Sequence, residues 1–237
     1  MVDDRSSLSS RPSPSPIEVA GPDDFIAAFG VSRETVERLS CYADLLKHWQ
    51  KAQNLVSSKT LDEIWQRHFA DSAQLLEVAP VDARIWCDLG SGAGFPGLVL
   101  AILLAGEEVS KPAPTVRLIE SNGRKCAFLR EVVRQTGIAE AGEIVEIVNR
   151  RIESPPDSAK VEPADIITAR ALAPLERLLD LAAPYVAPQS VALFLKGRDA
   201  RQELKRAEQS WRFTWNMISS RTDPDGHIIE IRNLRPV

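Results

Sequence analysis

The sequence predicts an α/β protein with a mostly parallel, seven-stranded sheet, helices on both faces of the sheet, and a helical extension in front of it. Three observations lead to this prediction. From residue 84 onward, short apolar runs alternate with amphipathic stretches. Residues 21–80 carry helical periodicity alone, and a turn with four glycines, at 90–97, follows the first apolar run. Alternating strands and helices form a parallel sheet covered on both faces, and such sheets bind ligands at the carboxyl ends of their strands.

The expected organisation has three parts. Residues 1–20 are rich in serine and proline and have no apolar stretch, so we expect a disordered tail rather than a secretion signal. Residues 21–80 form the helical extension and residues 81–237 form the domain built on the sheet, the two together making one compact unit. A chain of 237 residues is long enough for one well-packed core with an accessory layer.

The first helices are expected at 32–54 and 61–78, where apolar residues recur at helical spacing. The sheet and its covering helices follow. The strands, in chain order, are expected at 84–89, 115–120, 142–150, 164–169, 190–197, 212–219 and 227–234. The helices between them are expected at 95–105, with Pro96 in its first turn, at 122–137, ending at Gly137, at 175–186 and at 200–210.

Composition excludes several classes of protein. No apolar run approaches the roughly 20 residues that a membrane span requires. The three cysteines, Cys41, Cys87 and Cys126, are scattered without a C-x-x-C pair, which argues against a zinc site or a disulfide framework and fits a reducing cytoplasm. No metal site is expected. The net charge of −4 argues against a surface that binds nucleic acid throughout, although it allows a local basic face.

The glycine turn lies in the stretch CDLGSGAGFPG, residues 87–97, and allows two interpretations. Read from Gly92, it contains G-x-G-x-x-G, the dinucleotide fingerprint. Read from Asp88, it contains D-x-G-x-G-x-G, which is typical of S-adenosylmethionine sites. Glycines permit a tight turn and close approach of the backbone to a ligand, and the next helix begins with a positive dipole.

Acidic residues lie at the ends of the first two strands, and the first of them, Asp88, discriminates between these ligands. Asp88 ends the first strand, where a carboxylate would repel the phosphates of a dinucleotide but would favour a sulfonium cofactor with an α-amino group. Glu120 ends the second strand, where its carboxylate can accept hydrogen bonds from both ribose hydroxyls of either ligand. We therefore expect S-adenosylmethionine, with Asp88, Gly90, Gly92 and Glu120 among its contacts.

Beyond the turn, seven segments in a fixed order resemble the ribosomal small-subunit methyltransferase G family, also called the glucose-inhibited division protein B family. They span roughly residues 40–200 and read LLKHWQKAQNL, RHFADS, DLGSGAGFPGLVLAI, LIESNGRKCAFLREV, VNRRIE, DIITARALAPL and FLKGR. The resemblance implies a Rossmann-like class I S-adenosylmethionine-dependent methyltransferase. It implies transfer of a methyl group to N7 of one guanine in 16S rRNA.

The resemblance also implies roles for individual residues. Gly90 and Phe95 would contact the cofactor from the glycine turn, and Ile152 and Glu153 would bracket its adenine. Arg170 would lie beside both the cofactor and the substrate.

The chemistry of this acceptor is consistent with the sequence. Guanine N7 carries a lone pair and no proton, so its methylation requires alignment of nucleophile and methyl group rather than a base. No cluster of histidine and carboxylate residues suggests an acid–base pair. We expect Arg170 and Lys196 to act by positioning the substrate.

Basic residues crowd the expected strand ends and predict where RNA binds. The expected contacts are Arg124, Lys125, Arg151, Lys196 and Arg198. Phosphate contacts of this kind supply affinity without sequence information. The expected partner is 16S rRNA, either free or within a small ribosomal subunit that is still being assembled, and the expected state of the protein is a monomer.

Two other functions remain open at this point. One is a non-catalytic RNA-binding or assembly factor that retains the fold, and the other is a nicotinamide-dependent oxidoreductase. Roles for His68 and Asp71 also stay open, because they lie at i and i+3 on an expected helix and suit either packing or RNA contact.

Overall fold

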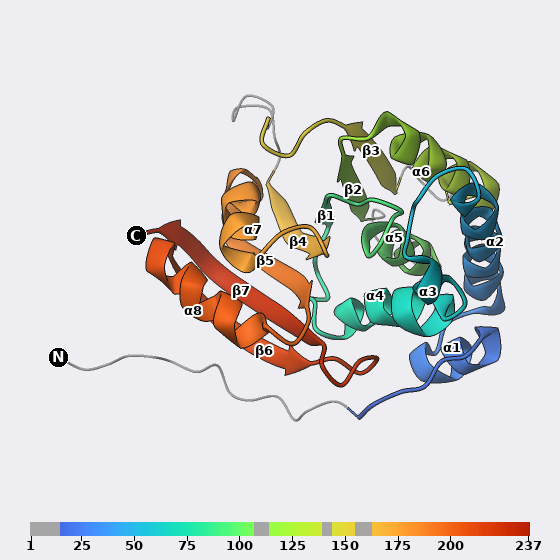
Figure 1. Cartoon of the computed structure of the whole chain (residues 1–237), viewed down its shortest axis with the longest axis horizontal. Helices are drawn as coiled ribbons and strands as arrows, with labels where there is room; N and C mark the ends of the chain where they lie inside the picture. Colours follow the sequence, from blue (N-terminus) through green and yellow to red (C-terminus); the bar gives the residue numbers. More distant parts are fainter. Residues whose placement is uncertain (1–14, 107–113, 139–143, 155–162) are drawn as a thin grey trace.

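The computed structural model describes residues 15–106, 114–138, 144–154 and 163–237 (Figure 1). Seven strands form one sheet in the order β3-β2-β1-β4-β5-β7-β6. Their bounds are β1 Ile85–Leu89, β2 Thr115–Glu120, β3 Val145–Asn149, β4 Ala164–Arg170, β5 Val186–Lys196, β6 Trp211–Ser219 and β7 His227–Pro236. Strands β1 to β5 run parallel, and β7 is antiparallel to both β5 and β6. The expected mostly parallel, seven-stranded sheet is confirmed.

Helices cover both faces of the sheet, and each face has its own apolar core (Figure 1). On one face α5, Gly97–Ala105, and α6, Gly123–Thr136, pack on the first strands. The other face is covered by α7, Leu175–Ala182, and α8, Ala200–Ser210. Helix α5 is buried over nearly its whole length, which explains why its sequence is apolar on every side.

The helical extension adds a further layer outside α5 and α6. It begins with α1, Pro22–Phe29, which the periodicity of the sequence did not single out, and continues with α2, Arg33–Gln50, which packs on α5 and α6. The Ser32 side chain accepts a hydrogen bond from the backbone N–H of Thr35, so the expected start of this helix is confirmed. A short helix α3, Ser58–Leu61, follows.

The segment expected as one helix at 61–78 is interrupted. It contains a π-helix η1, Trp65–Ala70, then α4, Asp71–Ala73, and a 3-10 helix η2, Gln74–Glu77. Uneven winding lets Phe69 pack in the apolar core while His68 lines a cavity at the sheet edge. Short π-helical turns of this kind often mark functional sites.

The described part of the expected tail packs against the protein. Val19 is buried, and its N–H donates to Oε1 of Gln66 across 2.7 Å. The N–H of Ile17 donates to the carbonyl of Arg221 across 2.9 Å. Residues 15–20 are therefore ordered by these contacts, contrary to the expectation, whereas residues 1–14 lie outside the described residues.

The register of the strands brings the functional loops together. Leu89 pairs with Ile119 and Asp88 pairs with Thr168, so β1, β2 and β4 end at one edge of the sheet. The glycine turn, Glu120 and Arg170 therefore meet there. Among the described residues, no helix is long and apolar enough to cross a membrane, and the same part of the chain contains no group of three or more residues suited to hold a metal ion.

Candidate active site

The glycine turn connects β1 to α5 through three residues with left-handed backbone. Gly90, Gly92 and Gly94 have φ values of 66°, 59° and 98°, a region that favours glycine. A Cβ atom at Gly90 would lie 2.6 Å from Cδ1 of Leu172, so a side chain there would also have to displace Leu172. Gly97 has another reason to be glycine, because a Cβ there would lie 2.4 Å from Leu118 in the core. In the G-x-G-x-x-G pattern, Gly92 and Gly94 are therefore required by the backbone conformation of the turn, and Gly97 is required by close packing against the core.

Asp88 lies beneath this turn rather than in a cavity. Its side chain is buried, and it accepts hydrogen bonds from the Thr168 hydroxyl at 2.9 Å and from the Gly97 N–H at 3.2 Å. Burial raises the pKa of Asp88 from 3.8 to about 6, against the opposing effect of these hydrogen bonds. In this structure Asp88 joins β1 to β4 and to the start of α5, and it lines none of the cavities described below.

Glu120 connects the end of β2 to the glycine turn. Its Oε2 accepts a hydrogen bond from the N–H of Gly92 at 2.9 Å, and its Oε1 accepts from the N–H of Asn122 at 2.7 Å. These two bonds fix the carboxylate, while a second lone pair on each oxygen remains for a ligand. Glu120 also lines a cavity of about 290 Å³ that includes Ile152, Glu153 and Arg151. The structure thus brings together the residues expected to surround the ribose and the adenine.

A second cavity, of about 440 Å³, lies on the other side of the turn. Gly90, Ser91, Gly92 and Phe95 line it from the turn, and His68 lines it from the helical extension. The two cavities meet, because both are lined by Gly90, Lys125, Arg170 and Ala171. After the ligand that the sequence predicts here, we call them together the cofactor cleft, with the ribose cavity beside Glu120 and the turn cavity beside Phe95.

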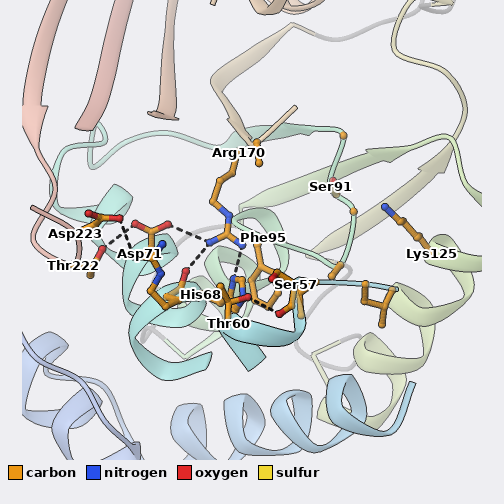
Figure 2. A pocket seen from close by; sticks show the side chains of 17 residues that line it. Ser57, Thr60, His68, Asp71, Ser91, Phe95, Lys125, Arg170, Thr222 and Asp223 are labelled. Atoms are coloured by element: carbon orange, nitrogen blue, oxygen red, sulfur yellow. Dashed lines mark hydrogen bonds and ion pairs between the residues drawn. The ribbon is translucent and has the colours of Figure 1, made fainter. Parts of the chain in front are cut away.

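Arg170 ends β4 and points into the turn cavity, where the helical extension holds its guanidinium (Figure 2). One nitrogen donates to the Arg67 carbonyl at 2.9 Å and to the Asp71 carboxylate at 3.2 Å. The other donates to Nδ1 of His68 at 2.6 Å. The guanidinium also lies 5.0 Å from the centre of the Phe95 ring. Four contacts therefore fix a side chain that lines both cavities of the cleft.

His68 has a single protonation state that fits these contacts. Since Arg170 donates to Nδ1, the ring is neutral and carries its proton on Nε2, which lies 2.9 Å from the Thr60 hydroxyl. Burial and the positive charges of Arg170 and Arg67 lower the pKa of His68 from 6.5 to about 3. The ring stacks on Phe95 with a centroid distance of 4.6 Å. A neutral His68 serves as an acceptor for Arg170 and is unsuited to act as a general base.

Phe95 stands at the centre of an aromatic cluster below the cleft. Tyr42 of α2 stacks on its other side at a centroid distance of 5.3 Å, and the Tyr42 hydroxyl donates to the carbonyl of Ala93 in the turn. Phe95 itself is nearly buried. The ring expected to line the cofactor pocket thus lines the turn cavity and also connects the glycine turn to the helical extension.

The expected RNA-binding residues differ in their availability. Arg124 and Arg151 are exposed, and Lys125 lines both cavities of the cleft. Arg198 is exposed and paired with Asp225 at 2.8 Å. Lys196, by contrast, has a side chain that is 9% exposed, and its ammonium donates to the Ala173 carbonyl at 2.6 Å and pairs with Glu203 at 2.8 Å. The ammonium of Lys196 is therefore engaged inside the protein.

The sequence left several residues of the site without a role. Asp71 accepts from Arg170, from the Thr222 hydroxyl at 2.9 Å and from Gln74 at 3.0 Å. Thr60 connects His68 to the carbonyl of Ser57, to which the Thr60 hydroxyl donates. The only signal in the sequence was the spacing of His68 and Asp71, at i and i+3 on one expected helix.

Comparison with known proteins places this site in a family. The family model for rRNA small subunit methyltransferase G matches residues 35–225. The chain belongs to this family. The rRNA small subunit methyltransferase G of Rhodospirillum centenum is 50% identical over 90% of this chain and 91% of its own length. That of Parvibaculum lavamentivorans is 47% identical over 92% of this chain and 91% of its own length.

Solved structures agree on the fold. The O-methyltransferase TomG from Streptomyces achromogenes, in complex with SAM, matches 89% of this chain and 95% of its own with a TM-score of 0.55 and 16% identity. An O-methyltransferase from Bacillus cereus, in complex with SAH, matches 89% of this chain and 96% of its own with a TM-score of 0.53 and 15% identity. The fold of this member of the methyltransferase G family is thus the Rossmann-like class I methyltransferase fold, as expected.

Proposed function

We propose that this protein transfers a methyl group from S-adenosylmethionine to N7 of a specific guanine in 16S rRNA of the small ribosomal subunit. Membership of the rRNA small subunit methyltransferase G family over residues 35–225 supports the enzyme class and the RNA substrate. The single observation that carries the proposal is the cofactor cleft, in which the glycine turn, Glu120 and Arg170 meet.

The residues of the cleft fit this cofactor. Glu120 offers free lone pairs to two neighbouring ribose hydroxyls, and Ile152 and Glu153 flank the same cavity. Gly90 lines both cavities of the cleft and carries no side chain, so a ligand can approach its backbone from the cleft. Asp88 contributes negative charge from beneath the turn and contacts the ligand only through the turn that it braces. Bound S-adenosylmethionine supplies an electrophilic methyl group attached to a positively charged sulfur.

The side chains of the cleft act by orientation. The lone pair of guanine N7 forms the new N–C bond while the methyl–sulfur bond breaks and sulfur keeps the electron pair, so no proton has to be removed. His68 is consistent with this, because its lowered pKa and its bond to Arg170 leave it without a basic role. The methylated guanine is cationic, so Arg170 is placed to hold a phosphate or the O6 edge rather than N7 itself.

Basic residues around the cleft, three of them exposed and Lys125 half-buried, are proposed to hold the RNA backbone. They are Arg124, Lys125, Arg151 and Arg198, whereas Lys196 positions the segment 170–174 through its bond to Ala173. Each phosphate contact with single-stranded RNA contributes a slope of about −0.7 to the dependence of log affinity on log salt concentration. Binding to 16S rRNA or to a small subunit under assembly places the protein in the cytoplasm, and we expect it to act as a monomer.

The test combines cofactor binding with acceptor chemistry. Stabilisation against thermal unfolding by S-adenosylmethionine, and none by NAD, is the expected result for the cleft. Next, 16S rRNA carrying 7-deazaguanosine at the methylated position should accept no methyl group, because it lacks N7. Methylation of the 7-deaza substrate, or stabilisation by NAD alone, would contradict the proposal. Failure of Arg170→Ala to change either cofactor affinity or methylation would remove Arg170 from the site.

A further inference from the structure

A third cavity, of about 440 Å³, adjoins the cofactor cleft on the far side of β4. One wall is the segment 170–174, which follows β4, and the opposite wall comes from the loop and strand start at 220–227. Lys196 and Glu203 close it on a third side. We call it the outer cavity. It shares Arg170 and Ala171 with both cavities of the cofactor cleft.

Its place in the sheet relates the outer cavity to methyl transfer. The cofactor cleft lies over the ends of β2, β1 and β4, while the outer cavity lies over β4, β5 and β7, the next strands in the sheet. A methyl donor that spans the ribose cavity and the turn cavity therefore has the segment 170–174 on one side. An acceptor has to reach the donor from a neighbouring space. The outer cavity is such a space, because it shares Asp71, Arg170, Ala171 and Asp223 with the turn cavity.

The lining of the outer cavity is polar where a base would need partners. Among the described residues, three carboxylates line it, those of Asp71, Glu203 and Asp223. His227 adds a ring whose Nδ1 is buried and has no hydrogen-bond partner among the described residues. Leu172 and Leu195 supply apolar surface. Enzymes that modify a base within a nucleic acid take the base out of its stack into a pocket of this kind and read its edge by hydrogen bonds.

We propose that the outer cavity receives the unstacked target guanine and that Asp223 selects it by accepting hydrogen bonds from guanine N1–H and the N2 amino group. This assignment rests on the proposed function. Guanine carries N7 and O6 on one edge and these two donors on the other. In the proposed pose N7 points toward the methyl group and these two donors point toward the loop 220–227, where Asp223 lines both the outer cavity and the turn cavity.

Asp223 is the best placed of the three carboxylates. Asp71 already accepts from Arg170, Thr222 and Gln74. Oε2 of Glu203 is held by the Leu175 N–H and by Lys196. Asp223, by contrast, makes one bond on each oxygen, from Arg67 at 2.8 Å and from the Asp225 N–H at 3.0 Å. One lone pair on each oxygen therefore remains, and its side chain, 31% exposed, is the most accessible of the three.

Inosine provides the test, because it lacks the N2 amino group and keeps N7, O6 and N1–H. Small subunits are assembled with 16S rRNA that carries either guanosine or inosine at the methylated position, and kcat/KM is measured for both. Wild-type protein should prefer guanosine by about 10- to 100-fold, the effect of one hydrogen bond to a charged group. Asp223→Asn presents an amide N–H₂ to one of the two guanine donors, so this preference should fall below about threefold.

Arg67→Gln is the matched control, because it removes the ion pair of Asp223 and leaves the carboxylate in place. This variant should keep the wild-type preference for guanosine. The preference is a ratio within each variant, so partial loss of folded protein does not affect it. A wild-type ratio in Asp223→Asn, equal loss of the ratio in both variants, or a wild-type protein that uses inosine as well as guanosine would overturn the assignment. If wild-type protein methylates neither RNA, the proposed function itself fails.

Discussion

The guanidinium of Arg170 donates a hydrogen bond to Nδ1 of His68 across 2.6 Å, although the two residues are 102 positions apart in the sequence. Arg170 ends β4 in the sheet, and His68 belongs to the helical extension. The bond therefore connects the two parts of the chain at the cofactor cleft, and the stack of His68 on Phe95 adds the glycine turn to the same cluster. The extension thus helps to build the candidate active site and does more than cover one face of the sheet.

Loss of the acceptor for Arg170 should impair methyl transfer. In His68→Ala the guanidinium loses its bond at Nδ1, and we expect kcat to fall about 10- to 100-fold, the range for a hydrogen bond to a charged group. In His68→Asn the side-chain oxygen takes the place of Nδ1, so this variant should recover most of the loss. His48→Ala, on an exposed part of α2, is the control and should leave kcat unchanged. Equal activity of all three variants would remove His68 from the positioning of Arg170.

Neutral His68 also predicts how stability depends on pH. Its pKa is about 3 in the folded protein, against an ordinary value of 6.5 in the unfolded chain, so between these values the unfolded chain binds the proton and the folded protein does not. This contribution to stability is fully present above pH 6.5 and is lost as the pH falls toward 3. Between pH 7 and pH 5 the loss is about 2 kcal/mol. Urea unfolding should show a smaller loss for His68→Asn over this interval, and parallel curves would contradict the neutral histidine.

Gly90 should matter for ligand binding as well as for backbone conformation. Gly90 and Gly137 have almost the same φ, 66° and 67°, so alanine at either position should cost about 1–2 kcal/mol of stability. At Gly90 the new methyl group would also displace Leu172, which lines the ribose cavity, whereas nothing lies within 4 Å of a Cβ at Gly137. Calorimetry should show S-adenosylmethionine affinity about tenfold lower for Gly90→Ala and unchanged for Gly137→Ala. Equal S-adenosylmethionine affinities in the two variants would mean that displacement of Leu172 does not affect ligand binding in the cleft.

Glu120 should carry the specificity of the ribose cavity. Glu120→Gln replaces one acceptor oxygen by a donor, which faces the N–H of either Gly92 or Asn122 and can no longer accept from a ribose hydroxyl. We expect S-adenosylmethionine affinity to fall about 10- to 100-fold. The control is Glu146→Gln. Glu146 is an exposed residue of β3 that pairs with Arg117 of β2, and this variant should bind S-adenosylmethionine as wild type does. Unchanged affinity in Glu120→Gln would exclude this carboxylate as a ligand contact.

Elements with strong local signals were predicted well. The bounds of β2 agree with the expected strand at 115–120, and α6 ends where Gly137 adopts a left-handed conformation. The packing of residues 15–20 was not predicted, and there the N–H of the buried Val19 donates to Gln66, a partner 47 positions away. Residues 61–78 gave one helical pattern, although distant partners decide how the chain winds there. Periodicity reports only local preferences, so the sequence predicted neither the packing of residues 15–20 nor the interruption of the helix at 61–78.

In the candidate site, the sequence predicted the positions of residues along the strands but not the directions of their side chains. The positions of Glu120 and Arg170 at strand ends follow from the strand pattern, and the structure brings both to the cleft. The direction of a side chain does not follow from it. Asp88 also ends a strand region, yet it faces Thr168 and Gly97 inside the protein, and Lys196 turns to Ala173 and Glu203. These directions depend on contacts between strands and helices that are far apart in the chain.

The most direct test of the proposed function is the fate of the methyl group. Small subunits that lack the modification are incubated with the protein and with S-adenosylmethionine labelled in its methyl group, and the 16S rRNA is then digested to nucleosides and analysed by mass spectrometry. We predict that the label is recovered as 7-methylguanosine from one position in 16S rRNA. Label on another atom or another base, or no label in the RNA while the cofactor is bound, would contradict the proposal.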